Sequence, residues 1–229
     1  MNPILNNPLI SIIIRTYNNE NTIFKSVNSA LIQDYENFEI LIINDGSTDK
    51  TAEIINSISD SNVRIIYQQN SGAISAAYMG IDHAKGDYIT FLDADDELTR
   101  DAIDSLYQPL KYNKYGFSYC DYLEINLETE ASEYISISNL FNIMVCGVMF
   151  KRIVIDKIGF WDKSFILPEH DYIIRVARKY QGIHINKPLY KYYRHSNSMT
   201  ADKDLVKKAK EQIFNKYGFI KDFKDYSIS

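Results

Sequence analysis

Four short hydrophobic runs lie in the first half of the chain, and a segment with helical periodicity follows each of them. The runs span residues 9–15, 38–44, 63–67 and 88–92, and the helical segments span about 22–32, 49–58, 74–84 and 99–110. The runs are almost continuously apolar, which is typical of parallel strands covered on both faces. Strands and helices that alternate at this spacing predict an α/β fold with a doubly wound, mostly parallel central sheet.

The second half of the chain has a less regular pattern. It offers two further strands at 117–126 and 146–150, a helix at 169–181, an antiparallel pair of edge strands at 182–186 and 189–195, and an amphipathic, lysine-rich helix at 202–217. No internal repeat and no low-complexity linker divides the sequence. We therefore expect one domain over residues 1–229, with a small irregular and antiparallel region after about residue 110 and a helical tail from about residue 201.

Polar residues gather immediately after the four hydrophobic runs. In chain order these segments read RTYNNE, NDGSTD, QQNSGA and DADDE. In a parallel sheet such strand ends meet at one edge, where ligands bind. The same residue types also form turns and helix caps, so we expect Ser47 or Thr48 to cap the second helix and Ser71 to cap the third. Capping does not account for the acidic segment.

The acidic segment places Asp93, Asp95, Asp96 and Glu97 within five residues at the end of an apolar run. Like charges this close repel and raise one another's pKa unless a cation lies among them. Carboxylates suit Mg²⁺ or Mn²⁺, and a magnesium site combines one or two of them with phosphate oxygens and water. The alternative is a solvated turn in which Asp96 or Glu97 favours the N-terminus of the next helix.

Asp45 directly follows the second hydrophobic run, in the segment INDGSTDKT. A carboxylate at this place can accept a hydrogen bond from a ring N–H of a nucleobase or from a ribose hydroxyl. The alternative is an Asp-Gly turn before a helix, because Gly46 permits a tight turn. Locally, the turn is the simpler interpretation.

Composition and charge exclude several classes of protein. A net charge of −5 provides no basic field for a nucleic acid partner. Two cysteines without a CxxC spacing form no disulfide framework, so a reducing, cytoplasmic location is expected.

The first 19 residues lack the basic region of a signal peptide, and no apolar stretch approaches the length of a membrane span. We expect the lysine-rich tail to pack on the domain, the alternative being peripheral contact with the inner membrane.

Four ordered segments carry a resemblance to a known family. They read SIIIRTYNNENTIFKSVNSALIQDYENFEILIINDGSTDKT, NSGAISAAYMGIDHAKGDYITFLDADDEL, FKRIVIDKIGFWDKSFILPEHDYIIRVAR and YYRHSNSMT. In this order they resemble the family 2 glycosyltransferases with the Rossmann-like GT-A fold, closely over roughly the first 110 residues. The resemblance implies an inverting enzyme that uses a nucleotide-sugar donor and a divalent metal ion, Mn²⁺ or Mg²⁺.

The resemblance assigns the strand ends to the donor site, in the half formed by about residues 1–110. It implies that Thr16 and Tyr17 lie against the base and ribose and that Asp45 contacts the base. The Asp-x-Asp motif, Asp93 and Asp95, then faces the ribose and the metal-bound diphosphate, whose developing charge a metal can neutralise without proton transfer. The complete set of expected donor-binding residues is Arg15, Thr16, Tyr17, Asn18, Asp45, Gly72, Asp93, Ala94 and Asp95.

The segment PEHDYIIRVAR resembles the part of the family that carries the general base, in the acceptor and catalytic half at about residues 111–200. An inverting transferase needs a carboxylate to take the proton of the acceptor hydroxyl. Counting back from Arg175 puts the usual base position at Glu169, where the family more often has Asp, and a second acidic position at Asp171. Glu169 is the preferred catalytic base and Asp171 the second candidate, although both also suit the first turn of a helix.

His195 in YYRHSNSMT matches a histidine that completes the metal shell or touches the diphosphate in many members. Asp95 and His195 are therefore the metal ligands that the resemblance implies. The chain departs from the family at Tyr78 and Met79, where Arg-Asn is usual. Loss of that arginine removes an expected donor contact, so the resemblance does not identify the donor sugar.

The expected function is hexosyl or N-acetylhexosaminyl transfer, with a UDP-sugar favoured, to a glycan or lipid-linked acceptor in bacterial surface polysaccharide or lipooligosaccharide synthesis. A nucleotidyltransferase would carry a glycine-rich, basic loop after the first strand, which RTYNNENT lacks. The alternative is a non-catalytic module that binds a nucleotide or a glycan in a degenerate pocket. Tyr78 and Met79 support it, because they replace the Arg-Asn pair that is usual in the family. The sequence carries no signal for the oligomeric state.

Overall fold

The first half of the chain forms the parallel part of one sheet. The computed structural model describes residues 7–137, 143–195 and 202–218. The strands of the first half are β1 (Ile10–Thr16), β2 (Phe38–Asn44), β3 (Val63–Tyr67) and β4 (Tyr88–Asp93), and its helices are α1 (Ile23–Leu31), α2 (Thr51–Asn56) and α3 (Ala73–His83). β1 pairs in parallel with β2 and β4, and β2 pairs in parallel with β3. The strands and helices predicted from the hydrophobic pattern are confirmed here.

The second half extends the same sheet with mixed pairing. Its elements are β5 (Glu97–Leu98), α4 (Ala102–Tyr107), η1 (Gln108–Lys111), β6 (Phe117–Asn126), β7 (Ser132–Ile135), η3 (Val145–Gly147), β8 (Val148–Lys151), α5 (Arg152–Ile158), α6 (Pro168–Ala177), β9 (Gly182–Arg194) and α7 (Lys203–Tyr217). The strand order is β3-β2-β1-β4-β8-β6-β9-β5, with β7 paired to β6. β8 runs antiparallel to both β4 and β6, so the purely parallel part of the sheet ends at β4.

Strand β9 corrects one prediction. The expected antiparallel pair of edge strands is instead one strand, Gly182–Arg194, which pairs in parallel with β6. The sequence reads as interrupted because Pro188 has no N–H to donate to the ladder. The register of the two strands shifts on both sides of Asp121, the residue that pairs with Pro188. The irregularity is therefore a bulge within a continuous strand.

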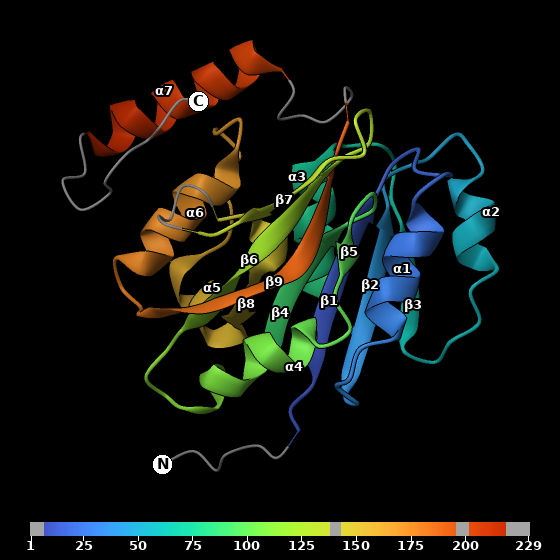
Figure 1. The fold of residues 1–229 in the computed structure, drawn as a ribbon, viewed down its shortest axis with the longest axis horizontal. Helices are drawn as coiled ribbons and strands as arrows, with labels where there is room; N and C mark the ends of the chain where they lie inside the picture. The colour runs from blue at the N-terminus through green and yellow to red at the C-terminus, as the bar shows by residue number, and fades with distance from the viewer. Residues whose placement is uncertain (1–6, 138–142, 196–201, 219–229) are drawn as a thin grey trace.

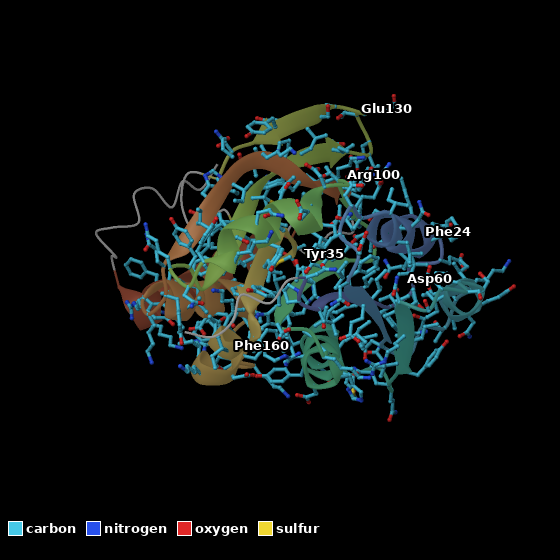
Figure 2. All side chains as sticks on the ribbon, turned by 90° about the horizontal axis from the view of Figure 1, so that it is seen from below. Phe24, Tyr35, Asp60, Arg100, Glu130 and Phe160 are labelled. Atoms are coloured by element: carbon cyan, nitrogen blue, oxygen red, sulfur yellow. The ribbon has the colours of Figure 1, made fainter. Side chains whose placement is uncertain are left out.

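Helices cover both faces of the sheet, with α1 and α4 in front and α3 and α5 behind in the view of Figure 1. Central strand residues such as Ile13 are 0% exposed, which explains why the runs do not alternate. An aromatic cluster joins β4 to the loop after α5. Phe91, Phe160 and Trp161 stack with ring centroids 4.7 to 5.8 Å apart. Phe160 also contacts Tyr78, on the side of the molecule where α3 and the end of α5 meet (Figure 2).

Helix α7 lies against α6 at one end of the molecule (Figure 1). Its N-cap is Asp202, whose carboxylate accepts hydrogen bonds from the backbone N–H groups of Asp204 and Leu205, both at 3.0 Å. The helix predicted at residues 202–217 is thus confirmed. Over the three described ranges, no helix combines the length and the apolar composition that crossing a membrane requires.

A buried carboxylate fixes the sheet at the end opposite the polar strand ends. Glu39 in β2 is 7% exposed and accepts hydrogen bonds from Ser11 Oγ (2.7 Å), the Lys85 backbone N–H (2.6 Å) and Arg64 (2.9 Å). Burial alone would raise the pKa of this carboxyl, but the three bonds hold it below its ordinary value. Glu39 therefore ties β1, β2 and β3 to the turn before β4.

Replacing Glu39 with alanine is expected to lower the free energy of unfolding by about 2–4 kcal/mol, because three donors lose their acceptor. The folded-state pKa lies below the unfolded value of about 4.3, so the stabilisation is present above that pH and is lost as the pH falls through the folded value. Urea titrations should show a wild-type advantage at pH 7 that shrinks as the pH falls below about 4. The exposed Glu36→Ala variant is the control, and an advantage that is the same at pH 3 and pH 7 would contradict the prediction.

Candidate active site

The loops after β1 and β2 are tied together at the carboxyl edge of the sheet. Asn18 adopts a left-handed backbone conformation with φ of 54°. Its N–H donates to Ser47 Oγ (3.1 Å), and its side-chain oxygen accepts from the Thr48 N–H (2.8 Å). The capping role predicted for these two residues is wrong, since the N-cap of α2 is Lys50, without a side-chain cap bond. Ser47 and Thr48 therefore form hydrogen bonds with Asn18 in the loop after β1 instead of capping α2.

Asp45 holds the loop that follows β3. Its carboxylate accepts hydrogen bonds from Gln68 Nε2 (2.7 Å) and from the backbone N–H groups of Ser71 and Gly72 (both 2.8 Å). The Ser71 hydroxyl donates to the Gln69 carbonyl (2.8 Å), so its predicted role as the side-chain cap of α3 is also wrong. A carboxylate has about four acceptor positions, and the three bonds fill most of those of Asp45, which is itself buried.

Thr16 ends β1 and Tyr17 follows it, at the same edge of the sheet. Thr16 is buried, and its carbonyl accepts from the Asp45 N–H (2.9 Å). Tyr17 is 45% exposed. An exposed aromatic ring at a strand end can stack on a planar ligand such as a nucleobase, so this part of the edge combines a stacking surface with hydrogen-bonding groups.

Arg15 supplies a cation to the acidic segment. Its guanidinium forms a salt bridge with Asp93 and lies 5.8 Å and 5.3 Å from the ring centroids of Phe91 and Trp161. Burial opposes the charge, yet the Asp93 carboxylate raises the pKa of Arg15 above its ordinary value. Within the described part of the chain, Nε of Arg15 is buried without a hydrogen-bond partner. Arg15 thus neutralises Asp93 and keeps one unused donor at the base of the site.

Asp96 is a buried carboxyl group. It is 1% exposed and accepts hydrogen bonds from the Tyr190 hydroxyl and from the Tyr193 backbone N–H (2.8 Å). Burial, reinforced by the nearby charges of Asp93 and Asp95, raises its pKa to about 8. The environment of Asp96 therefore favours its neutral form.

Glu97 has cationic partners of its own. It lies in β5, where it pairs with Lys25 (2.5 Å) and Lys191 (3.7 Å). Neither Asp96 nor Glu97 begins a helix, because α4 starts only at Ala102. The suggestion that these carboxylates favour a helix N-terminus is wrong, and both instead bind groups from β9.

Asp95 and His195 lie side by side although they are 100 residues apart in the sequence. Asp95 Oδ2 and His195 Nε2 are 3.0 Å apart, and the two side chains are 30% and 29% exposed. This is a hydrogen-bond distance, and a carboxylate and an imidazole are also ligand types that Mn²⁺ accepts. Among the described residues no cluster of three or more His, Cys, Asp or Glu is arranged to hold a metal. The SNSMT segment of the resemblance, residues 196–200, lies outside the described residues.

Helix α6 carries the two base candidates in different environments. Glu169 lies in the first turn and is half-buried, and its charge contributes to the raised pKa of Arg15. Asp171 is 0% exposed, and both of its oxygens accept hydrogen bonds from other side chains. Burial alone would raise the pKa of Asp171, but these bonds lower it. Glu169 is therefore the more accessible of the two carboxylates, whereas Asp171 is engaged by other side chains.

Two residues at the site, Trp161 and Cys146, escaped sequence reasoning, and Tyr78 was noted there only as a departure from the family. Trp161 covers the guanidinium of Arg15, and its place in the segment FWDKSF, within a matched stretch, was the available signal. Cys146 is buried beside Asp93, which raises the pKa of the thiol together with burial itself, and no local pattern marks it. The hydroxyl of Tyr78, where the family has arginine, donates to the Trp161 carbonyl (2.5 Å). The departure at Tyr78 therefore has a structural role in this chain.

The sequence matches known proteins over most of its length. Residues 11–196 match the family model described as Glycosyl transferase family 2. A protein from Haemophilus influenzae named as an uncharacterized glycosyltransferase is 39% identical over 127 residues, which cover 54% of this chain and 51% of that protein. The UDP-Glc:alpha-D-GlcNAc-diphosphoundecaprenol beta-1,3-glucosyltransferase WfaP of Escherichia coli is 35% identical over 205 residues, covering 85% of this chain and 81% of that protein.

A solved structure shares the fold. The mannosyltransferase PcManGT from Pyrobaculum calidifontis, in complex with GDP-Man and Mn²⁺, matches with a TM-score of 0.72 and 16% identity over 93% of this chain and 65% of that chain. This likeness confirms the predicted α/β GT-A architecture with its mixed, mostly parallel sheet. The chain spans about half the length of the Haemophilus relative and a quarter or less of several other relatives.

Proposed function

The chain belongs to glycosyltransferase family 2 and is a glycosyltransferase, and from that premise we propose that it transfers a sugar from a nucleotide-diphosphate donor to an acceptor hydroxyl with inversion. The observation that carries the proposal is the pairing of Asp95 with His195 at 3.0 Å, on the sheet edge where Asp45 holds the loop after β3. In this proposal the pair holds the metal and the loop receives the nucleoside, which suits a donor that contains both a base and a diphosphate.

The donor site is proposed to use the residues assigned from the resemblance. Mn²⁺ or Mg²⁺ held by Asp95 and His195 would neutralise charge on the leaving diphosphate. Asp45 would accept a hydrogen bond from a ring N–H of the base, and Tyr17 would stack on it. We favour a UDP-sugar because the Escherichia coli relative, which matches 85% of this chain, is named for a UDP-Glc donor.

Glu169 is proposed as the general base. It would take the proton of the acceptor hydroxyl while that oxygen attacks the anomeric carbon from the face opposite the diphosphate, which inverts the configuration. Asp171 is the weaker candidate, because its buried carboxylate is occupied by other side chains. Arg15, which forms a salt bridge with Asp93, would hold that carboxylate in place beside the donor.

The acceptor is proposed to be a glycan or a lipid-linked saccharide. The name of the Escherichia coli relative specifies a diphosphoundecaprenol acceptor, which supports a role in bacterial surface polysaccharide or lipooligosaccharide synthesis. Such an acceptor would place the enzyme at the cytoplasmic face of the inner membrane. The exposed lysines Lys203, Lys207 and Lys208 of α7 suit peripheral contact with anionic lipid.

Isothermal titration with UDP and then GDP, with and without Mn²⁺, tests the donor site. Wild type is expected to bind one of these nucleotides in a metal-dependent manner. Asp95→Ala should weaken that binding at least about tenfold, a loss of 1.4 kcal/mol or more, because one of the two metal ligands is removed. Asp82→Ala is the matched control, since Asp82 is an exposed carboxylate on α3.

The titration has two adverse outcomes. Equal affinity with and without Mn²⁺ would contradict the metal site. Failure of every nucleoside diphosphate to bind in the presence of metal would contradict the donor site and would favour the module with a degenerate pocket, for which the replacement at Tyr78 is the sequence argument.

A further inference from the structure

Helix α7 rests on α6 through a small cluster that is separate from the main core. Phe165, Ile174 and Ile213 form this cluster, and Tyr217 packs against it. Lys216 Nζ lies 4.7 Å from the ring centroid of Phe165. Hydrophobic stabilisation is roughly proportional to the apolar area buried. A cluster of so few side chains therefore contributes little to holding α7 on α6. The polar contacts of α7 with α6 therefore become important.

Asp171 is the centre of those polar contacts. Its Oδ1 accepts hydrogen bonds from Lys216 Nζ (2.7 Å) and the Tyr217 hydroxyl (2.5 Å), both on α7. Its Oδ2 accepts from Arg175 Nε (2.7 Å), one turn further along α6. Charge-assisted bonds to a fully buried carboxylate are among the stronger hydrogen bonds in proteins. Asp171 is thus committed to joining α6 and α7.

Asp171 and Glu169 point in different directions. They are two residues apart on α6, and each residue turns about 100° around the helix axis, so their side chains lie about 200° apart. Asp171 faces α7, so Glu169 points away from α7. The first turn of α6 is therefore held by α7 on the side opposite Glu169.

Further hydrogen bonds fix the loop between α5 and α6. Gln212 of α7 accepts from the Ile166 N–H (2.8 Å) and donates to the Ser164 carbonyl (3.1 Å). Arg175 donates to two carbonyls at the end of α5 and in the loop, at 3.1 Å and 2.5 Å. The loop contains Trp161, whose ring covers Arg15. The contacts of α6 and α7 with this loop therefore help to position Trp161, which packs on Arg15.

We propose that Asp171, Lys216 and Tyr217 form a positioning lock that sets Glu169 against the acceptor hydroxyl. The lock rests on the proposed function, in which Glu169 takes the acceptor proton. A general base must lie within hydrogen-bond reach of that proton, and a misplacement of about 1 Å can cost about 100-fold in rate. Asp171 is then a positioning residue, and α7 determines the rate without touching the substrate.

The test compares wild type with Lys216→Met, Tyr217→Phe and the double variant in the release of UDP from UDP-glucose, with Mn²⁺ and with water as the acceptor. The double variant is expected to lose about 10- to 100-fold in kcat, with the KM for UDP-glucose unchanged. Lys216→Arg should retain most of the rate, because arginine still donates to Asp171. Glu211→Met, which removes an exposed charged side chain from the same helix, is the control.

The pH profile separates a positioning role from proton transfer. Asp171→Asn should lower kcat and leave the acidic limb of the kcat profile in place, because the titrating base is Glu169. Disappearance of that limb in Asp171→Asn would make Asp171 the base and overturn the proposal. Wild-type kcat in the folded double variant would overturn it as well.

Amide hydrogen exchange gives a readout that does not need turnover. Residues 168–177 of α6 should exchange faster in the double variant than in wild type, and β1 and β2 should not change, because only the contacts of α6 are weakened. If wild type releases no UDP, the proposed function fails, and the exchange experiment still decides on the lock. Unchanged protection of α6 in the double variant would rule the lock out.

Discussion

Glu169→Gln is expected to lower kcat by about 10²- to 10⁴-fold, the usual contribution of general base catalysis, and to leave the affinity for nucleoside diphosphate unchanged. Glutamine has nearly the shape of glutamate but cannot take a proton from the acceptor hydroxyl. Glu169 lies on α6, whereas Asp95 and His195 come from the loops after β4 and β9, so donor binding should survive the change. UDP release gives kcat, and isothermal titration gives the affinity.

Glu169→Asp is the matched variant for this experiment. The family more often has aspartate at this position, and the shorter carboxylate can still accept the proton. Its kcat should therefore fall between those of wild type and Glu169→Gln. A Glu169→Gln variant that keeps kcat within about threefold of wild type would exclude Glu169 as the base and return the role to Asp171.

Asp45→Asn is expected to produce the second large effect, on stability and on binding together. It should lower the free energy of unfolding by about 1–3 kcal/mol, because the buried Asp45 side chain loses its part-buried hydrogen bond with the Gly72 N–H. The amide oxygen can keep the bonds of Oδ1 to Gln68 and Ser71, but the amide nitrogen would then face the Gly72 N–H, which is also a donor. The loop after β3 should move away from the edge, weakening nucleotide binding at least about tenfold.

Asp49→Asn is the matched control for Asp45→Asn. Asp49 also accepts two backbone N–H bonds, from Glu20 (3.1 Å) and Thr51 (2.9 Å), but it lies nearer to solvent. Water can satisfy a displaced N–H there, so the stability should change by about 0.5 kcal/mol or less. Chemical denaturation and nucleotide titration of both variants are the measurements. Equal losses of stability and of nucleotide affinity in the two variants would contradict this prediction. They would show that the loss of charge explains the effect and that the buried geometry at Asp45 does not.

The acidic segment shows how a site is completed by residues far away in the chain. Asp93 is neutralised by Arg15, 78 positions earlier, and Asp95 is joined by His195, 100 positions later. Asp96 is buried against Tyr190, and burial raises its pKa. Each carboxylate of the crowded segment therefore has its own partner from a distant part of the chain.

The sequence by itself determined the parallel half of the sheet and the polar edge where its strands end. Those features depend on short-range periodicity, and the continuous apolar runs required burial on both faces whatever the rest of the chain did. The Asp202–Tyr217 helix was predictable for the same reason, since its cap and its amphipathic pattern are local.

The tertiary structure alone decided the parallel pairing of β9, the burial of Asp171 and the environments of Asp45 and Asp96. Strand pairing across Pro188 depends on the partner strand β6, which local sequence does not specify. Likewise, the difference between Glu169 and Asp171 comes from Lys216 and Tyr217 of α7, more than 40 residues further along the chain. A carboxylate's role depends on its burial and its partners, and long-range packing sets both.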